Sequence, residues 1–300
     1  MARTEREQRL AYGYALLAVV FWATAASAFK ISLTYVGVLP LLFVASVTST
    51  AVFLSYAVIS DRLRLLQTFT RRDYLRSAWL GLLNPFLYYT VLLKAYSLLP
   101  AQEAQPINFV WPLTLVLLSI PLLGQRIGLS SIVPILISFS GVVVIATRPT
   151  HPADILDFRF SSGPGVLLAL GSTVIWSLFW IYSTKDDRDP AVRLLLNFVF
   201  ASTYILALLL AVGPRTVPPW QGLLGGAYVG IFEMGVTFLA WLKALKTART
   251  TAHIVNLIYL VPFLALLVIR LTVGETIRPS TIIGLMLIIT GIVLQRTFSR

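Results

Sequence analysis

Long apolar runs dominate the chain, and short polar gaps separate them. A helix needs roughly 17 to 25 apolar residues to cross ~30 Å of hydrocarbon, and runs of about this length recur ten times. They cover residues 10–30, 39–59, 74–93, 101–123, 130–147, 163–182, 191–212, 220–242, 251–273 and 281–296. The pattern predicts an all-α integral membrane protein with ten transmembrane helices.

The composition favours the same fold class. Hydrophobic residues make up 57% of the 300 residues and charged residues only 12%, against about 25% charged in a soluble domain. The formal net charge is +12, but the basic residues lie in gaps between apolar runs, not on the basic folded face of a nucleic-acid-binding domain. We therefore expect the lipid bilayer, and no nucleic acid, as a partner. Because the chain has no cysteine, disulfides and thiolate chemistry are excluded.

The second half of the chain repeats the first at an offset of 150 residues. The repeated positions include Pro112 and Pro262, Gly124 and Gly274, and Gly141 and Gly291. Five spans leave the chain on the opposite side of the membrane, so the second copy is inserted upside down. We predict two inverted five-helix repeats, residues 1–150 and 151–300, an architecture of secondary transporters. A membrane-embedded enzyme or scaffold built by duplication is the alternative.

Basic residues predict the orientation of the chain. With the N-terminus inside, 17 of the 24 Lys and Arg residues lie on the inner side and 7 on the outer side. This predicts a multi-pass protein of the cell inner (plasma) membrane with both termini cytoplasmic. The first run also resembles a cleavable signal peptide. Its length, and the pairing of Trp22 with Trp176 in the second repeat, favour a retained span.

One acidic residue lies deep in the apolar sequence. When Lys94 is aligned with Lys243, Asn84 of the third span falls opposite Glu233 of the eighth. A charged side chain at mid-membrane costs roughly 2.5 to 3.5 kcal/mol on insertion scales and nearly always faces a cavity or a partner. Both repeats thus place a polar group at one level, which indicates a transport site. A protonated carboxyl that is hydrogen-bonded within the bundle is the alternative.

Amides and aromatic rings are paired in the third and fourth spans. Asn84 precedes Tyr88 by four residues, and Asn108 precedes Trp111 by three, spacings that place each pair on one helical face. Prolines at positions 85, 112 and 262 remove backbone donors inside spans. This is tolerated where the backbone is buried in protein or lines a cavity. These spans are therefore predicted to line the site.

Several tryptophans lie too deep in their spans for the aromatic belt at the membrane surface. Packing between helices is the alternative explanation for any single ring, but the rings cluster beside amides. The predicted substrate-binding residues are Trp22, Asn84, Tyr88, Tyr89, Asn108, Trp111, Trp176, Trp180, Glu233, Asn256 and Tyr259.

The repeated motifs resemble those of a known family. They are Trp22, Pro112, Gly124-Gln125 and Gly141-Val142 in the first copy, and Trp176, Pro262, Gly274-Glu275 and Gly291-Ile292 in the second. Over essentially the whole chain, the sequence resembles the EamA-type branch of the drug/metabolite transporter superfamily, and within it the bacterial exporters of aromatic amino acids. The resemblance implies a basket-shaped bundle of ten helices. It also implies a central cavity lined by the first, third, fourth, sixth, eighth and ninth helices.

The sequence gives little support for an enzyme, a metal site or a phosphate-binding site. The two histidines, at positions 151 and 253, form no metalloprotease motif and no Ser-His pair at membrane depth. No glycine-rich segment matches a phosphate-binding loop, and no Lys or Arg lies at the midplane to hold a sugar phosphate. We therefore expect no catalytic residue, no metal site and no cofactor.

The sequence thus predicts an exporter of aromatic and other neutral amino acids or related small metabolites that works by alternating access. The rings would stack on the substrate, and the asparagines and proline-freed backbone would hold its polar end. The alternative is a proton-coupled exporter of cationic drugs, in which Glu233 exchanges a proton for the cation and the rings supply cation–π contacts.

Overall fold

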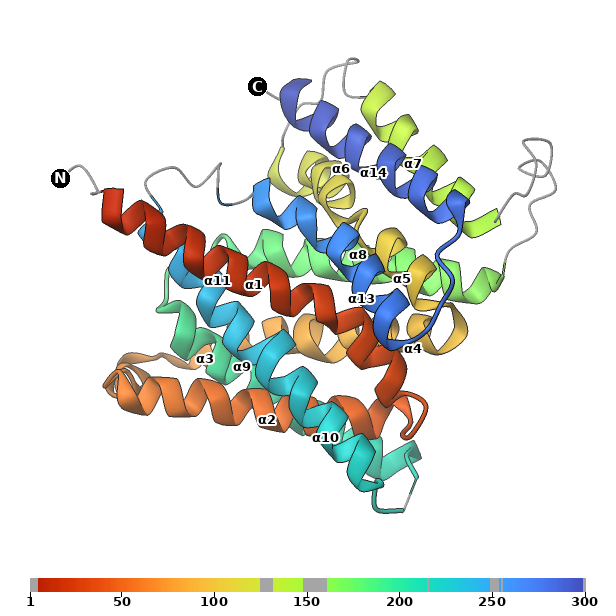
Figure 1. The fold of residues 1–300 in the computed structure, drawn as a ribbon. Helices are drawn as coiled ribbons and strands as arrows, with labels where there is room; N and C mark the ends of the chain where they lie inside the picture. The colour runs from red at the N-terminus through yellow and green to blue at the C-terminus, as the bar shows by residue number, and fades with distance from the viewer. Residues whose placement is uncertain are drawn as a thin grey trace. The chain divides into compact units, whose positions relative to one another are not determined.

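The structure is a computed structural model that describes residues 5–124, 132–147, 161–214, 216–248, 254 and 256–298. Within these residues it contains helices and no strand (Figure 1). The predicted all-helical fold class is therefore confirmed. Gln125 lies outside the described residues, and so do the first residues of the fifth and ninth predicted spans.

Six helices in the described part of the chain are long and apolar enough to cross a membrane. They are Glu5–Ser32, Val38–Ile59, Ala101–Leu123, Gly163–Ser183, Pro190–Val212 and Trp220–Thr247. Shorter apolar helices cover Val133–Thr147, Leu257–Thr272 and Pro279–Leu294. The chain is thus a multi-pass membrane protein by length and composition, while the count of ten spans and the inverted repeat remain predictions.

The chain forms two compact units, and each unit takes segments from both halves of the sequence. The first unit comprises Met1–Phe86 and Asp187–Val268, and the second comprises Leu87–Asp186 and Ile269–Arg300. Helix α13 (Val261–Thr272) contributes residues to both. The predicted repeats, residues 1–150 and 151–300, were inferred from similarity between the two halves of the sequence. The two compact units do not test this inference, so the repeats remain a prediction.

In the first unit, α1 (Glu5–Ser32) packs along α11 (Val236–Thr247), and α2 (Val38–Ile59) packs along α9 (Pro190–Val212). The remaining elements of this unit are η1 (Leu63–Thr68), α3 (Arg71–Gly81), α10 (Trp220–Tyr228), η5 (Val229–Gly235) and η6 (Leu257–Leu260). Ala11, Ala15 and Ala18 are buried against Trp241 and Ala244. Small residues allow helices to approach closely in a membrane, which explains the alanine face of α1.

In the second unit, three consecutive helices pack on α8 (Gly163–Ser183). They are α4 (Tyr88–Leu98), α5 (Ala101–Asn108) and α6 (Trp111–Leu123). Figure 1 shows α7 (Ile132–Thr147) and α14 (Pro279–Phe298) side by side. These two helices are in close contact because glycines face each other: a Cβ added to Gly141 would lie 2.5 Å from the carbonyl oxygen of Gly284.

Two predicted spans are interrupted by wider helical turns. The segment η2 (Leu82–Leu87) separates α3 from α4, and η5 separates α10 from α11. Asn84 lies in η2 and Glu233 in η5, so the two residues aligned in the sequence both fall on interruptions. Asn84 has φ −145° and ψ 122°. The prediction that Asn84 and Tyr88 share one helical face is therefore wrong, because the helix is not continuous between them.

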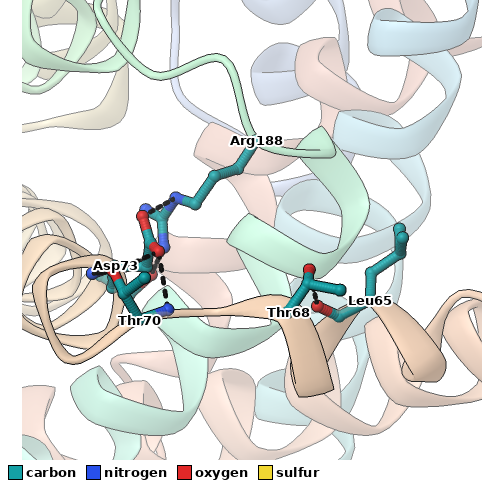
Figure 2. A network of polar contacts seen from close by, with 6 residues as sticks. Leu65, Thr68, Thr70, Asp73 and Arg188 are labelled. Atoms are coloured by element: carbon teal, nitrogen blue, oxygen red, sulfur yellow. Dashed lines mark hydrogen bonds and ion pairs between the residues drawn. The ribbon is translucent and has the colours of Figure 1, made fainter.

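A network of polar contacts links α3 to the segment before α9 within the first unit (Figure 2). Arg188 Nη1 donates to the Asp73 carbonyl at 2.6 Å and to Ser77 Oγ at 2.9 Å. Asp73 also accepts from Thr70 N and Oγ1 at 2.8 and 2.6 Å and so caps α3. Arg62 pairs with Asp189. These bonds join α3 and the segment before it to the segment before α9, and basic residues predict both regions to be cytoplasmic.

Candidate functional site

Aromatic rings from three helices of the second unit surround Trp176. Relative to the Trp176 ring centroid, Tyr88 lies at 4.6 Å, Phe179 and Trp180 at 5.8 Å, and Trp111 at 6.4 Å. Ring pairs at such distances contribute about 0.5 to 1.5 kcal/mol beyond the area they bury. These five residues form what we call the aromatic cluster, and four of them were predicted from the sequence.

The regular helix α8 supplies three rings of the cluster. Its N-terminus is capped by Ser162, whose hydroxyl accepts from the backbone N–H of Gly165 at 3.1 Å. Trp176, Phe179 and Trp180 are spaced by three and four residues, so they share one face of the helix. Both tryptophans are half-buried. Each tryptophan thus keeps part of its surface exposed.

The other two rings of the cluster stand at the first residues of their helices. Tyr88 begins α4 and is 7% exposed, and Trp111 begins α6 and is half-buried. The predicted residue Tyr89 is fully buried and lies 4.8 Å from Tyr88, centroid to centroid. The buried Tyr89 ring thus packs against the Tyr88 ring inside the second unit.

A chain of hydrogen bonds fixes the polar end of Tyr88. The hydroxyl of Tyr88 donates to Asn108 Oδ1 at 3.3 Å, and Asn108 Nδ2 donates to Ser172 Oγ at 2.9 Å. Ser172 Oγ in turn donates to the carbonyl oxygen of Ala169 at 2.6 Å. Asn108 thus joins α5 to α8 and orients Tyr88. The sequence predicted a pairing of Asn108 with Trp111, but the partner of its amide oxygen is Tyr88.

Further hydroxyls attach α6 to α8. Ser177 Oγ donates to the carbonyl oxygen of Trp111 at 3.1 Å, and the hydroxyls of Thr114 and Thr173 lie 2.9 Å apart. Thr173 Oγ1 also donates to the carbonyl oxygen of Leu170 at 2.6 Å. These contacts hold the Trp111 ring beside Trp176 through the backbone. The geometry of the cluster is therefore fixed by hydrogen bonds on two sides.

The remaining predicted site residues belong to the first unit. Trp22 of α1 packs against Trp241 at 5.3 Å and against Phe238 at 6.4 Å, centroid to centroid. Asn256 is exposed and Tyr259 is half-buried, and both lie at η6, which packs against α1.

Glu233 is 7% exposed and lies in the interrupted segment η5. The neighbouring Phe232 ring lies 5.0 Å from Phe21 and 4.9 Å from Tyr228. Ser49 of α2 donates to the carbonyl oxygen of Gly230 at 2.8 Å. The segment that carries the buried carboxyl is thus held by α1 and α2.

Asn84 is fully buried, and neither atom of its side-chain amide has a hydrogen-bond partner among the described residues. Asn197 of α9 is also fully buried, and its side-chain amide likewise has no hydrogen-bond partner among the described residues. Its backbone lies against Gly81, where an added Cβ would meet the Asn197 carbonyl oxygen at 2.3 Å. Two adjacent helices of the first unit therefore each carry a buried amide that no described group satisfies.

Some of these residues were not predicted from the sequence. Phe179 completes the aromatic cluster, Ser172 accepts from the Asn108 amide, and Asn197 shares the unusual burial of Asn84. For Asn197, the available signal was an amide inside the apolar run 191–212. For Ser172 no signal distinguishes one small hydroxyl from the others in the span.

Within the described residues, no group of three or more His, Asp or Glu side chains is placed to hold a metal ion. The two histidines, His151 and His253, lie outside the described residues. The aromatic cluster itself consists of ring side chains and of the hydroxyl and amide groups that bond to them.

These features define a class of protein: a helical multi-pass membrane protein with a cluster of aromatic side chains in the second unit. A model of the EamA-like transporter family matches residues 9–147 and 163–297, and the chain belongs to this family. The resemblance stated from the motifs is thus confirmed. The protein is a membrane transporter and not an enzyme.

Two relatives are named as amino-acid exporters. The probable terminal-alkyne amino-acid exporter of Streptantibioticus cattleyicolor is 28% identical over 294 residues, 95% of this chain and 93% of that protein. The aromatic amino acid exporter YddG of Ancylobacter novellus is 28% identical over 162 residues, which is 54% of this chain and 55% of YddG. A crystal structure with 22% identity matches 97% of each chain with a TM-score of 0.66. That likeness concerns the fold alone.

Proposed function

We propose that the protein exports aromatic and other neutral amino acids or related small metabolites across the inner membrane by alternating access. The observation that carries this proposal is the aromatic cluster around Trp176, with partly accessible tryptophan rings on α6 and α8. Stacking on such rings suits a substrate that has a flat apolar part. The names of the two exporters above support an amino acid as that substrate.

The interruptions η2 and η5 support the alternating-access part of the proposal. Interrupted helices at corresponding places of two repeats are the strongest sequence-level indication of a transport site. Here the interruptions carry Asn84 and Glu233, which the repeat alignment relates. The two separate matches to the family, residues 9–147 and 163–297, agree with a duplicated chain.

We assign individual roles unit by unit. In the second unit Trp111, Trp176 and Trp180 offer ring faces, and Tyr88 adds a fourth ring that Asn108 orients. Asn84, Glu233 and Asn256 are the polar candidates of the first unit, and Trp22, Tyr89 and Tyr259 support the rings and polar groups of their own units. The network of Arg188, Asp73 and Arg62 supports cytoplasmic termini, because it gathers segments that are rich in basic residues.

The second candidate is a proton-coupled exporter of cationic drugs. One observation favours it: the carboxyl of Glu233 is almost fully buried in an apolar span, where ionisable residues often carry protons. In such an antiporter the carboxyl must release and take up a proton in each cycle.

The substitution Glu233→Gln separates the two candidates. An amino-acid facilitator should lose only a moderate part of its transport, since Asn84 shows that an amide fits the related position. An antiporter should lose all transport driven by a pH gradient while it still exchanges substrate between the two sides. The measurement is uptake of labelled L-phenylalanine and of a labelled organic cation into proteoliposomes, with and without a pH gradient.

Glu275→Gln is a matched control for the Glu233 substitution. The Glu275 carboxylate accepts from the backbone N–H groups of Ala101 and Gln102 at 2.8 and 3.0 Å and therefore caps α5. Its replacement should lower stability without changing the response to the pH gradient. Complete loss of gradient-driven transport in Glu233→Gln alone would replace the facilitator with the antiporter.

A further inference from the structure

The polar atoms around the aromatic cluster are almost all paired within the protein. The Tyr88 hydroxyl, the Asn108 amide and the Ser172 hydroxyl form one chain that ends on a backbone carbonyl. The hydroxyls of Ser177, Thr173 and Thr114 are also bonded. These groups therefore shape the cluster and have few free positions for a ligand.

Trp180 carries a cluster atom that is both buried and without a described partner. Its indole Nε1 is buried and has no hydrogen-bond partner among the described residues, although its ring is half-buried and contacts Trp176 and Phe179. Buried polar atoms in native proteins nearly always have a partner, and each exception calls for an explanation. A ligand that brings a partner would remove the cost of this unpaired group.

The chemistry of the indole restricts what that partner can be. Indole Nε1–H is a donor only, so the ligand must present an acceptor. A carboxylate is the strongest acceptor for such a donor because the hydrogen bond is charge-assisted. An organic cation has no acceptor to offer and would leave the N–H unpaired. The free donor thus favours an anionic or zwitterionic ligand over the cationic drug of the second candidate.

The position of the donor suits a ring-bearing carboxylate. Trp180 follows Trp176 by four residues, about 6 Å along the helix axis, and the two ring centroids are 5.8 Å apart. In an aromatic amino acid the carboxylate is linked to the ring by a short two-carbon bridge. A molecule of this size therefore spans the distance between the Trp176 and Trp180 rings.

We infer that Trp180 Nε1–H is the specificity-determining donor for the substrate carboxylate. This inference rests on the proposed function and deepens it, because it assigns to Trp180 a hydrogen bond in addition to ring contact. A substrate that lacks an acceptor beside its ring binds without this bond. The residue thereby selects amino acids and aryl carboxylates against aryl amines.

The substitution Trp180→Phe removes the donor and keeps an aromatic ring. We would measure binding of L-phenylalanine, 3-phenylpropionate and 2-phenylethylamine to the purified full chain by isothermal titration calorimetry. The variant should bind the first two probes about tenfold more weakly, the loss expected for one hydrogen bond to a charged group. Its affinity for 2-phenylethylamine, which has no carboxylate, should stay within about twofold of that of the unmodified protein.

A matched control makes the same chemical change outside the cluster. Trp79 of α3 is 47% exposed, and Trp79→Phe should leave all three affinities unchanged. Thermal unfolding of both variants shows whether the substitution disturbs the fold.

The outcomes distinguish this inference from the proposed function. If Trp180→Phe weakens all three probes equally, or none of them, the donor role is wrong while the proposed function stands. If the unmodified protein binds 2-phenylethylamine but neither carboxylate probe, the proposed function is wrong and the assignment of Trp180 is wrong with it. Selective weakening of the two carboxylate probes supports both.

Discussion

At the scale of single residues, the hydrogen-bond partners of a polar side chain indicate its role. A side chain bonded within the protein orients its neighbours, whereas one without a partner can bind a ligand. Asn108 was predicted to bind the substrate, but both atoms of its amide are used within the second unit. Asn84 was predicted beside Tyr88, yet its amide has no described partner. A buried polar group without a partner costs about 1 to 3 kcal/mol. Such a cost is tolerated most easily where function requires the group.

Replacement of Asn84 by leucine tests this argument. Leucine has a similar size and no polar atom, so Asn84→Leu should raise the unfolding temperature of the detergent-solubilised protein by a few degrees. If Asn84 contacts the substrate, the same variant should lose most of its transport. Both quantities are measured on one preparation, by thermal unfolding and by uptake into proteoliposomes.

Asn197→Leu is the matched control, because Asn197 has the same burial and the same lack of described partners. It should raise the unfolding temperature and leave transport near normal. Undiminished transport in Asn84→Leu would remove Asn84 from the site. A fall in unfolding temperature in both variants would show that the amides have stabilising partners after all.

Spacing along the sequence indicates a shared helical face only where the helix is regular, and not where it is interrupted. On α8 the periodicity holds, so Trp176 and Trp180 could be recognised from their depth in the apolar run. At Asn84 the backbone is extended, and a spacing of four residues no longer means one face. Tertiary partners such as Ser172 depend on how α5 meets α8, which the local sequence does not encode.

At the scale of elements, prolines mark the points where apolar runs change their helical form. Pro112 is the second residue of α6, after the turn that ends α5, and Pro262 is the second residue of α13, after η6. Proline is well tolerated in the first turn of a helix, where its missing N–H has no partner to lose. The sequence predicted freed carbonyls inside continuous spans at these two positions. In the structure each proline stands in the first turn of a helical segment, within the longer apolar helices Ala101–Leu123 and Leu257–Thr272.

Contact between α7 and α14 depends on glycine. A methyl group at position 141 would lie 2.5 Å from the Gly284 carbonyl oxygen and 3.0 Å from the Ile288 backbone nitrogen. Backbone atoms cannot move aside as a flexible side chain can, so Gly141→Ala should destabilise the protein by about 1 to 3 kcal/mol. Thermal unfolding in detergent should show this as a drop of several degrees.

Gly171→Ala on α8 provides the comparison for this prediction. A Cβ at Gly171 meets nothing within 4 Å, and alanine is favoured over glycine in a helix. The unfolding temperature should stay constant or rise slightly. Equal effects of the two substitutions would contradict the close glycine contact between α7 and α14.

At the scale of the whole molecule, the two compact units and the two sequence repeats divide the chain differently. Residues 1–86 join residues 187–268 in one unit, whereas the repeats divide the chain near residue 150. The apolar runs and the family could be predicted because hydrophobicity and motif spacing are local properties. Which spans pack together depends on contacts between distant segments, such as the Arg62–Asp189 pair, and was not predicted.

The predicted topology can be tested with single cysteines, since the chain contains none. A cysteine at Arg71, next to the polar network, should react with an impermeant thiol reagent only from the cytoplasmic side. A cysteine at Asp157, which lies outside the described residues, should react only from the opposite side. Labelling of both cysteines from the same side would contradict the ten-span topology.

The most direct test of the central claim is counterflow of labelled L-phenylalanine into proteoliposomes loaded with unlabelled aromatic amino acid. The unmodified protein should accumulate label well above protein-free liposomes. Tyr88→Ala and Trp111→Ala should weaken apparent affinity about ten- to a hundredfold, because burial of a ring is worth ~1.5 to 3 kcal/mol. Trp220→Ala, at a site 66% exposed, should have no such effect. Absence of counterflow, or near-normal counterflow in both ring variants of the cluster, would contradict the account.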